Sequence, residues 1–313
     1  MIKTAISNKT NLKESLHIVK ELQQIFLTSC NLELINNKLN ELQLIRDSLT
    51  IDEEESLKIN FRLIMSPIIF QSQFCKYSNI KPRGYTGDFG AMELIWNAQN
   101  NEKLKFRGTS ELGKKINAVT LSMDNCVANG KRVWLLKKFI DQYKNANIAS
   151  IGSGSGIEII EHYKTNKTNN FTLFDQDPMS YALFSHKLKT LDSALSKKTE
   201  FKKGNVYKSV LQDKSEYSFI YSSGLFDYLN MDSAIKLAKI LWGKVKSGGQ
   251  LLITNAHPDN PTKLWMEYVG DWWLLYKTKQ EMESISNALE GVTKLEYIID
   301  DNNVYQYIIM TKK

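Results

Sequence analysis

The feature that most constrains the fold is an alternation of short β-rich runs with helical runs, which starts near Ile148. "NIASI", "NFTLFD", "YSFIYSS" and "GGQLLITNA" are each followed by a stretch with apolar residues at helical spacing. Strands that alternate with helices need right-handed crossovers and so form a mainly parallel sheet. The last two runs, "KLEYIID" and "VYQYIIMTK", are joined by "DNN", which predicts a hairpin and an antiparallel strand at the end of the sheet.

The first part of the chain has a helical pattern instead. Apolar residues recur every three or four positions from Leu12 to Phe26 and again from Leu32 to Leu49. Asn11 and Asn31 stand at N-cap positions, and "SLTIDEEES" separates the second helix from a third near Leu57 to Met65. We therefore expect a helical domain over 1–145, forming a lid and a wall on the substrate side, and an α/β domain over 146–313.

Composition narrows the choice of partners. The 313 residues carry a net charge of +7, which favours anionic partners, but the lysines are spread out rather than gathered into a stripe with aromatic residues. This spread argues against a nucleic-acid partner. Three separated cysteines and four scattered histidines predict reduced thiols in a cytoplasmic protein and no metal site. No apolar run of spanning length and no signal-peptide pattern is present, so we expect no membrane span.

The run "IASIGSGSGIEI" places a glycine turn directly after the first predicted strand. Gly152, Gly154 and Gly156 give G-x-G-x-G, whereas a dinucleotide-binding loop needs its third glycine at Ile157 and a P-loop needs a following lysine. The turn therefore exposes backbone amides without the spacing for a pyrophosphate. Asp175 ends the second strand, where a carboxylate can accept both hydroxyls of a ribose. Asp177, before Pro178, fits a helix cap.

These stretches resemble class I S-adenosylmethionine-dependent methyltransferases. "IASIGSGSGIEI" looks like their first motif, "TLFDQDP" like the ribose-binding motif, "KGNVYKS" like the adenine loop, and "FIYSSGLFDYL" like the fourth strand with its loop. The resemblance implies a Rossmann-like sheet, S-adenosyl-L-methionine as cofactor and S-adenosyl-L-homocysteine as product. The cofactor-binding residues that it implies are Gly152, Ser153, Gly154, Ser155, Gly156, Asp175, Gln176, Asn205, Val206, Ser222, Ser223 and Gly224.

A narrower resemblance involves both halves of the chain. "KPRGYTGDFGAMELI", "GLFDYL" and "TNAHPDNPTKLWMEYVGDWWLLYK" are similar to bacterial methyltransferases of extracellular-factor 3-hydroxypalmitic acid methyl ester biosynthesis, which have peptide-tailoring relatives. This resemblance implies methyl transfer to a carboxylate oxygen, on a hydroxy fatty acid or on a peptide C-terminus in natural-product biosynthesis. Both small-molecule acids and peptides remain open as substrates, as do a monomer and a homodimer.

The residues expected at the acceptor come from both halves. Arg83 and Tyr85 lie in the predicted lid "KPRGYTGD", where Gly84 and Gly87 also fit a plain turn and Asp88 a helix cap. An arginine fork suits a carboxylate. The other expected substrate residues are Arg132, Asp227, Tyr228, Asn255, Trp272 and Tyr276, although aromatic residues at helical spacing between 265 and 276 also fit a core.

His257 is the candidate general base. A carboxylate acceptor is already ionised at neutral pH and needs no base, whereas an amine or hydroxyl acceptor generally does. Two alternatives therefore stay open: N-methylation of an amine or nucleobase, and a non-catalytic protein that keeps the cofactor fold as a scaffold.

Overall fold

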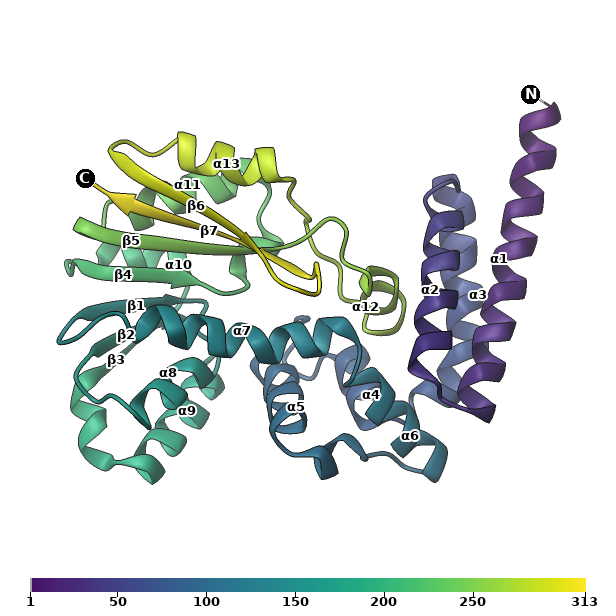
Figure 1. Cartoon of the computed structure of the whole chain (residues 1–313), viewed down its shortest axis with the longest axis horizontal. Coiled ribbons are helices and arrows are strands. Elements are labelled where there is room, and N and C mark those ends of the chain that lie inside the picture. Colours follow the sequence, from purple (N-terminus) through teal and green to yellow (C-terminus); the bar gives the residue numbers. More distant parts are fainter. Residues whose placement is uncertain (1) are drawn as a thin grey trace. The chain divides into compact units, whose positions relative to one another are not determined.

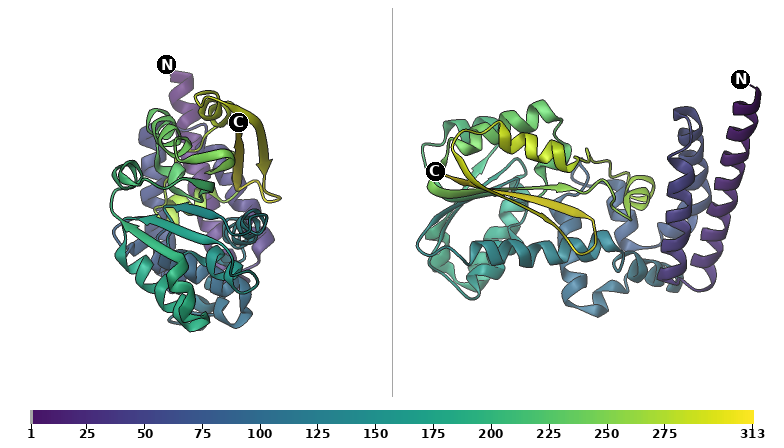
Figure 2. Two further views of the ribbon diagram at one scale, coloured as in Figure 1. Left: turned by 90° about the vertical axis from the view of Figure 1, so that its left-hand side faces the viewer. Right: turned by 45° about the horizontal axis from the view of Figure 1, so that its top comes forward.

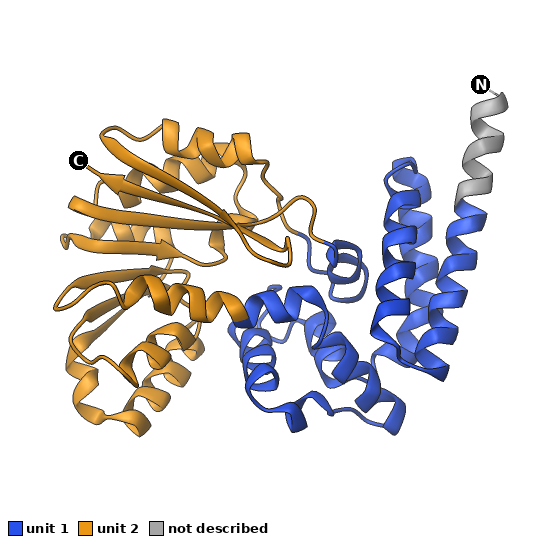
Figure 3. Ribbon diagram, in the orientation of Figure 1, with its two compact units in different colours: residues 1–130, 261–273 blue, residues 131–260, 274–313 orange. Residues whose placement is uncertain are grey.

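The computed structural model describes the backbone of residues 2–313 and the side chains of residues 12–313. The chain divides into two compact units (Figure 3). Unit 1 contains residues 1–130 and 261–273, and unit 2 contains residues 131–260 and 274–313. These bounds differ from the expected division of the chain at residue 145. The compact units do not test whether 1–145 and 146–313 are separate domains, so that division stays a prediction.

Unit 2 is built on a seven-stranded sheet with the order β3-β2-β1-β4-β5-β7-β6 (Figure 1). Neighbours are parallel from β3 to β5, and β7 runs antiparallel to both β5 and β6. The predicted α/β class, with its Rossmann-like and mostly parallel sheet and one antiparallel strand, is confirmed. The strands are β1 Asn147–Ile151, β2 Asn170–Asp175, β3 Thr199–Lys203, β4 Tyr217–Ser222, β5 Val245–Ala256, β6 Val292–Ile299 and β7 Tyr305–Lys312.

Helices cover both faces of this sheet (Figure 1). α10 Val206–Gln212, α11 Met231–Trp242 and α13 Lys279–Asn287 bury their apolar sides in one core with β1, β4 and β5. α8 Ile157–Tyr163 and α9 Pro178–Leu191 lie on the opposite face, together with the C-terminal part of α7 Asp124–Ile140. Two short 3₁₀ helices, η2 Ser193–Lys198 and η3 Leu225–Tyr228, complete the unit.

The predicted hairpin at "DNN" is present between β6 and β7. The carboxylate of Asp300 accepts hydrogen bonds from the backbone N–H groups of Asn302 at 3.1 Å, Val304 at 2.9 Å and Tyr305 at 2.9 Å. An aspartate that bonds its own following backbone in this way stabilises a turn. This local bonding stabilises the turn after which β7 runs back antiparallel to β6.

Unit 1 is helical, and α1, α2 and α3 lie side by side (Figures 1 and 2). Asn31 caps α2, accepting the Leu34 N–H at 3.0 Å as predicted. The prediction that Asn11 caps the first helix is wrong, because α1 begins at Ile2 and Asn11 lies inside it. α3 begins at Ile51, earlier than expected, because Thr50 and Glu53 form a reciprocal capping box inside the segment interpreted as an interruption. The helices are α1 Ile2–Thr28, α2 Leu32–Arg46, α3 Ile51–Ile69, α4 Gln73–Ile80, α5 Phe89–Asn100, η1 Glu102–Lys105, α6 Glu111–Thr120 and α12 Lys263–Val269.

The segment 261–273 completes the core of unit 1. Trp265 stacks on Phe26 with ring centroids 5.4 Å apart, and Tyr268 meets Phe61 edge-on at 5.4 Å. The Arg46 guanidinium forms two ion pairs: Nη1 lies 2.6 Å from the Glu267 carboxylate, and Nη2 lies 2.7 Å from the Glu54 carboxylate. Most of this aromatic segment is therefore core.

Among the described residues, no helix combines the length and apolar character that crossing a bilayer requires.

Candidate functional site

The predicted cofactor residues lie in loops at the C-terminal ends of neighbouring parallel strands of unit 2. β1 lies between β2 and β4, so the chain leaves β1 toward one side of the sheet and later returns on the other. In open α/β sheets, ligands bind at this point, where the strand order reverses. The loops after β1, β2, β3 and β4 surround it in unit 2.

The loop after β1 adopts a backbone that only glycine accepts readily. Gly152, Gly154 and Gly156 have φ angles of +65°, +53° and +55°. The N–H groups of Gly152 and Ser153 donate to the Phe174 carbonyl at 2.8 and 3.2 Å, which fixes the loop against the end of β2. A Cβ at Gly156 would lie 2.9 Å from the Phe184 ring. The three glycines thus serve the turn, and Gly156 also allows α9 to pack closely against it.

Asp175 connects the end of β2 to this glycine loop. Its carboxylate accepts the Gly154 N–H at 2.7 Å on one oxygen and the Asp177 N–H at 2.8 Å on the other. Burial raises the pKa of Asp175, against the lowering effect of these backbone N–H groups. Each carboxylate oxygen has two lone pairs, so Asp175 keeps capacity for further donors. The neighbouring Gln176 is exposed, and Asp177 caps α9 as the sequence allowed.

Ser153 carries a buried hydroxyl at the tip of the glycine loop. The side chain is 9% exposed, and among the described residues its Oγ makes no hydrogen bond. A buried hydroxyl without a partner costs stability, so such a group usually has a ligand or a water to bind. Ser155, two positions on, is also buried.

The loop after β3 is hydrogen-bonded to the C-terminal end of β2. The Gly204 N–H donates to the Asp175 carbonyl at 3.0 Å, and the Asn205 side chain caps α10 by accepting the Lys208 N–H at 3.3 Å. Val206 begins α10 and is half-buried. The predicted adenine loop therefore starts directly beside the acidic strand end.

The loop after β4 lies next to the glycine loop. Ser222 Oγ donates to the Ile151 carbonyl at 3.1 Å and joins the ends of β4 and β1. Ser223 and Gly224 lead into η3, and a Cβ at Gly152 would lie 3.3 Å from Cβ of Leu225. The structure thus brings the four predicted cofactor segments together at the C-terminal ends of the parallel strands β1 to β4.

Asp227, in η3, is a buried carboxylate with one occupied oxygen. That oxygen accepts the Ala256 N–H at 2.7 Å and the Asn255 side-chain N–H at 2.9 Å. The other oxygen makes no hydrogen bond within the described part of the chain. Burial raises the pKa of Asp227 to about 6, although Arg132, the Ala256 N–H and Lys277 act to lower it. A carboxyl group that titrates near neutral pH suits a reaction site.

Asn255 and Lys277 form the hydrogen-bonded surroundings of Asp227. The Asn255 amide donates to Asp227 and to the Leu275 carbonyl at 3.2 Å, and its oxygen accepts the Lys277 N–H at 2.7 Å. Lys277 is buried and donates through Nζ to the Phe226 carbonyl at 2.7 Å; burial lowers its pKa. Sequence reasoning missed Lys277, because one lysine after an aromatic stretch carries no recognisable signal.

The other predicted residues of unit 2 lie in different surroundings. The guanidinium of Arg132 lies over the Tyr305 ring, 4.2 Å from its centroid. His257 Nδ1 accepts the Asp259 N–H at 3.2 Å, so in the neutral ring the proton sits on Nε2. Tyr228 is 42% exposed at the end of η3, and Tyr276 is half-buried.

Arg83, Tyr85 and Trp272 belong to unit 1. Arg83 lies over the Phe89 ring at 5.6 Å, Tyr85 is half-buried and Trp272 is buried. The surrounding turn follows the simpler expectation. Gly84 and Gly87 have positive φ angles, and Asp88 caps α5 by accepting the Ala91 N–H at 2.8 Å. The roles of these three residues at the acceptor stay predictions.

Comparison with known proteins gives a likeness of fold. No protein-family model and no curated protein sequence matches the chain. A possible exported protein from Bordetella parapertussis superposes with a TM-score of 0.59 at 14% identity, covering 96% of both chains.

Two further solved structures have lower scores. The S-adenosylmethionine-dependent methyltransferase SibL gives a TM-score of 0.49 at 11% identity, and a putative O-methyltransferase from Nostoc punctiforme gives 0.48 at 13%. Each covers 99% of this chain and 97% of its own. At these identities the comparisons concern the fold.

Proposed function

We propose that the chain is an S-adenosylmethionine-dependent methyltransferase that converts a carboxylate into a methyl ester. The observation that carries the proposal is the glycine loop of unit 2. Its Gly154 amide is bonded to Asp175, and the buried Ser153 hydroxyl beside it makes no hydrogen bond. A tight turn, an acidic strand end and an available buried hydroxyl fit a nucleoside ligand better than a purely structural turn. This fit also speaks against a scaffold that has lost its cofactor.

Four segments would hold the cofactor. Asp175 has free lone pairs for the ribose hydroxyls, the 152–156 loop offers backbone N–H groups, and Ser153 offers its hydroxyl. Asn205 and Val206 would border the adenine, with 222–224 on the other side. When bound, S-adenosylmethionine supplies an electrophilic methyl group on a positively charged sulfonium.

A carboxylate acceptor agrees with the state of His257. An ionised carboxylate needs no base, and positioning with exclusion of water supplies much of the rate enhancement. The nitrogen of neutral His257 that can take a proton already accepts the Asp259 N–H. We assign Arg132 and Asp227 to positioning the acceptor, since a guanidinium pairs with a carboxylate, and Asp227 in its protonated form, within reach at a pKa of about 6, can donate a hydrogen bond to one. A hydroxy fatty acid and a peptide C-terminus are the two acceptor classes proposed.

A second candidate is N-methylation of an amine. Asp227 favours it, because a carboxylate with a pKa of about 6 and one unoccupied oxygen has the basicity of a general base. In this alternative Asp227 takes the proton of the amine. The rate would then fall as the pH drops through about 6.

Mass spectrometry of the product separates the two reactions. The protein is incubated with methyl-labelled S-adenosylmethionine and a 3-hydroxy fatty acid, a peptide with a free C-terminus, or the same peptide as its C-terminal amide. We expect the label on the free acid only, in a form that mild base removes. A base-stable label on the peptide with the C-terminal amide would establish methylation of an amine. No label on any acceptor would leave the carboxylate proposal without support.

Asp175→Ala tests the cofactor assignment separately from the acceptor. We expect S-adenosylmethionine binding to weaken by about 1.5–3 kcal/mol, the scale for hydrogen bonds to a charged group. Isothermal titration calorimetry measures this change. Asp192→Ala is the matched control, because Asp192 pairs with Lys167 outside the proposed site. Equal affinity in a folded Asp175→Ala protein would show that the ribose lies elsewhere.

A further inference from the structure

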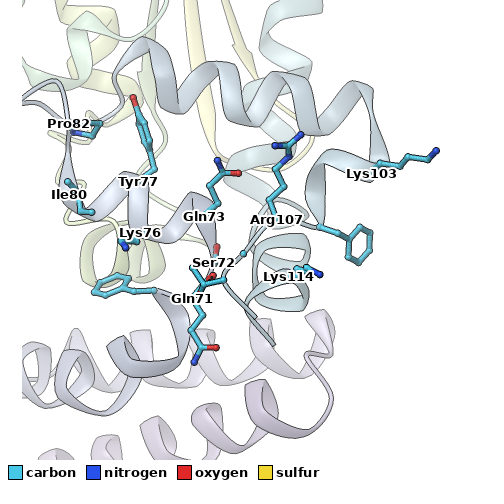
Figure 4. A pocket seen from close by; sticks show the side chains of 14 residues that line it. Gln71, Ser72, Gln73, Lys76, Tyr77, Ile80, Pro82, Lys103, Arg107 and Lys114 are labelled. Carbon is cyan, nitrogen blue, oxygen red and sulfur yellow. The ribbon is translucent and has the colours of Figure 1, made fainter. Parts of the chain in front are cut away.

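Unit 1 contains a hollow of about 830 Å³ that the proposed reaction does not use (Figure 4). It is formed by α4, the turn after it and the segment 103–114. The antiparallel bridge between Ser72 and Gly108 holds these parts together, with the Gln73 N–H bonded to the Arg107 carbonyl at 3.3 Å. Its volume lies within the range of ligand pockets, about 300–1,000 Å³.

The charged groups of the hollow all have the same sign. Its lining includes Lys76, Lys103, Arg107 and Lys114 and contains no aspartate or glutamate. Lys114 pairs with Glu111 at 2.5 Å. The other three cations are exposed and have no ion-pair partner among the described residues. Uncompensated positive charge around a concave surface attracts an anionic ligand.

The walls between these cations are apolar. Ile80 is 60% exposed and Phe106 is 50% exposed, and Phe70 and Pro82 line the same hollow. Large apolar side chains that gather at an exposed concave surface mark a binding site more often than scattered ones do. The ligand should therefore carry apolar groups beside its negative charges.

Gln73 adds hydrogen-bonding capacity. Its side-chain amide makes no hydrogen bond within the described residues, and it extends in the same direction as Tyr77 and Arg107 (Figure 4). A free amide offers both a donor and an acceptor, as a peptide backbone requires. This capacity distinguishes a peptide from a simple fatty acid.

We propose that the hollow binds an acidic peptide segment whose apolar side chains contact Ile80 and Phe106. Its carboxylates would pair with Lys76, Lys103 and Arg107, and Gln73 would bond its backbone. A nucleic acid fits less well, since a phosphate chain needs a continuous basic track. Here Glu102 and Glu111, each paired with a lysine, interrupt the basic surface at the edge of the hollow. The proposal does not depend on the methyl-transfer activity.

Fluorescence anisotropy with the full chain tests the proposal. The probe is a short fluorescent peptide that alternates Glu with Phe and Leu, and its control replaces every Glu with Gln. We expect the Glu peptide to bind roughly tenfold more tightly, with an affinity that falls as NaCl is added. Equal binding of the two peptides would overturn the proposal.

Variants of exposed residues connect the binding to this hollow. The triple variant Lys76→Gln, Lys103→Gln, Arg107→Gln should weaken the Glu peptide at least roughly tenfold. Ile80→Ser should weaken both peptides. Lys115→Gln, on α6 but outside the lining, is the matched control and should change neither. Unchanged affinity in the triple variant, or tighter binding of an oligothymidylate than of the Glu peptide, would reject an acidic peptide as the ligand.

Discussion

The hydroxyl of Ser153 makes opposite predictions for stability and for binding. Because Oγ is buried without a partner, its removal in Ser153→Ala should leave the free energy of unfolding unchanged or slightly higher. If the hydroxyl bonds the cofactor, the same change should weaken S-adenosylmethionine binding by about 0.5–1.5 kcal/mol. Urea unfolding and calorimetry on one protein sample measure both. A variant that loses stability but keeps its affinity would place the partner of Ser153 within the fold.

Asp227 should make stability depend on pH in a recognisable way. Its pKa of about 6 lies above the ordinary aspartate value of 3.8, so the folded protein keeps the proton over a pH range in which the unfolded chain has lost it. The unfolded state therefore binds fewer protons, and the contribution of Asp227 to stability falls as the pH rises from about 4 to 6. Asp227→Asn lacks this loss.

The comparison of wild type with Asp227→Asn isolates the effect. The stability of the variant relative to wild type should increase by up to about 3 kcal/mol between pH 4 and pH 7. Denaturant unfolding at several pH values gives the difference directly. A difference that stays constant over this range would mean that Asp227 is ionised with an ordinary pKa.

At the scale of single elements, the start of α3 depends on one capping box. Thr50 accepts the Glu53 N–H, and Glu53 accepts the Thr50 N–H at 2.9 Å. Thr50→Ala should lower the free energy of unfolding by about 1 kcal/mol. Thr28→Ala is the control, because its exposed hydroxyl bonds only the Gln24 carbonyl within α1, and it should cost less than about 0.5 kcal/mol. Equal effects in urea unfolding would contradict the capping role.

The elements show what a sequence can and cannot predict. Continuous apolar runs identified β1, β2, β4 and β5 because these strands are buried. β3, "TEFKK", was missed because it is a sheet edge on which charged residues alternate, as edge strands commonly do. The early start of α3 was readable in principle from the Thr50 to Glu53 spacing.

The candidate site was predictable only where its residues lie close together in the sequence. The glycine loop and Asp175 lie on consecutive elements, so spacing alone related them. Lys277 reaches the Phe226 carbonyl, next to Asp227, through folding of a distant segment, and no local pattern predicts that contact. The unpartnered hydroxyl of Ser153 depends on atoms of several loops, which a sequence does not place.

At the scale of the whole molecule, the interleaved segment 261–273 predicts how a truncated chain behaves. A chain starting at Lys131, where unit 2 begins, keeps Trp265, Tyr268 and Glu267 but loses Phe26, Phe61 and Arg46, their partners in unit 1. It should therefore bind a hydrophobic dye and aggregate. Replacing 261–273 with a short Gly/Ser linker in the same truncated chain should restore a monodisperse sheet unit, because the exposed apolar side chains are gone.

Size-exclusion chromatography and dye fluorescence of the two truncated chains measure this difference. A truncated chain that stays monodisperse without the linker would mean that 261–273 packs elsewhere. Loss of methyl transfer in the linker chain, with S-adenosylmethionine binding retained, would assign the helical unit to the acceptor rather than to the cofactor.

The same interleaving sets an order of events during translation. Phe26 and Phe61 are synthesised early, but the rings that cover them, Trp265 and Tyr268, come some two hundred residues later. At a synthesis rate of about 5–20 residues per second, the ribosome needs on the order of ten seconds or more to supply them. Throughout that interval the nascent helices carry uncovered aromatic surface. Unit 1 therefore finishes folding after most of the sheet has been made, although its sequence begins the chain.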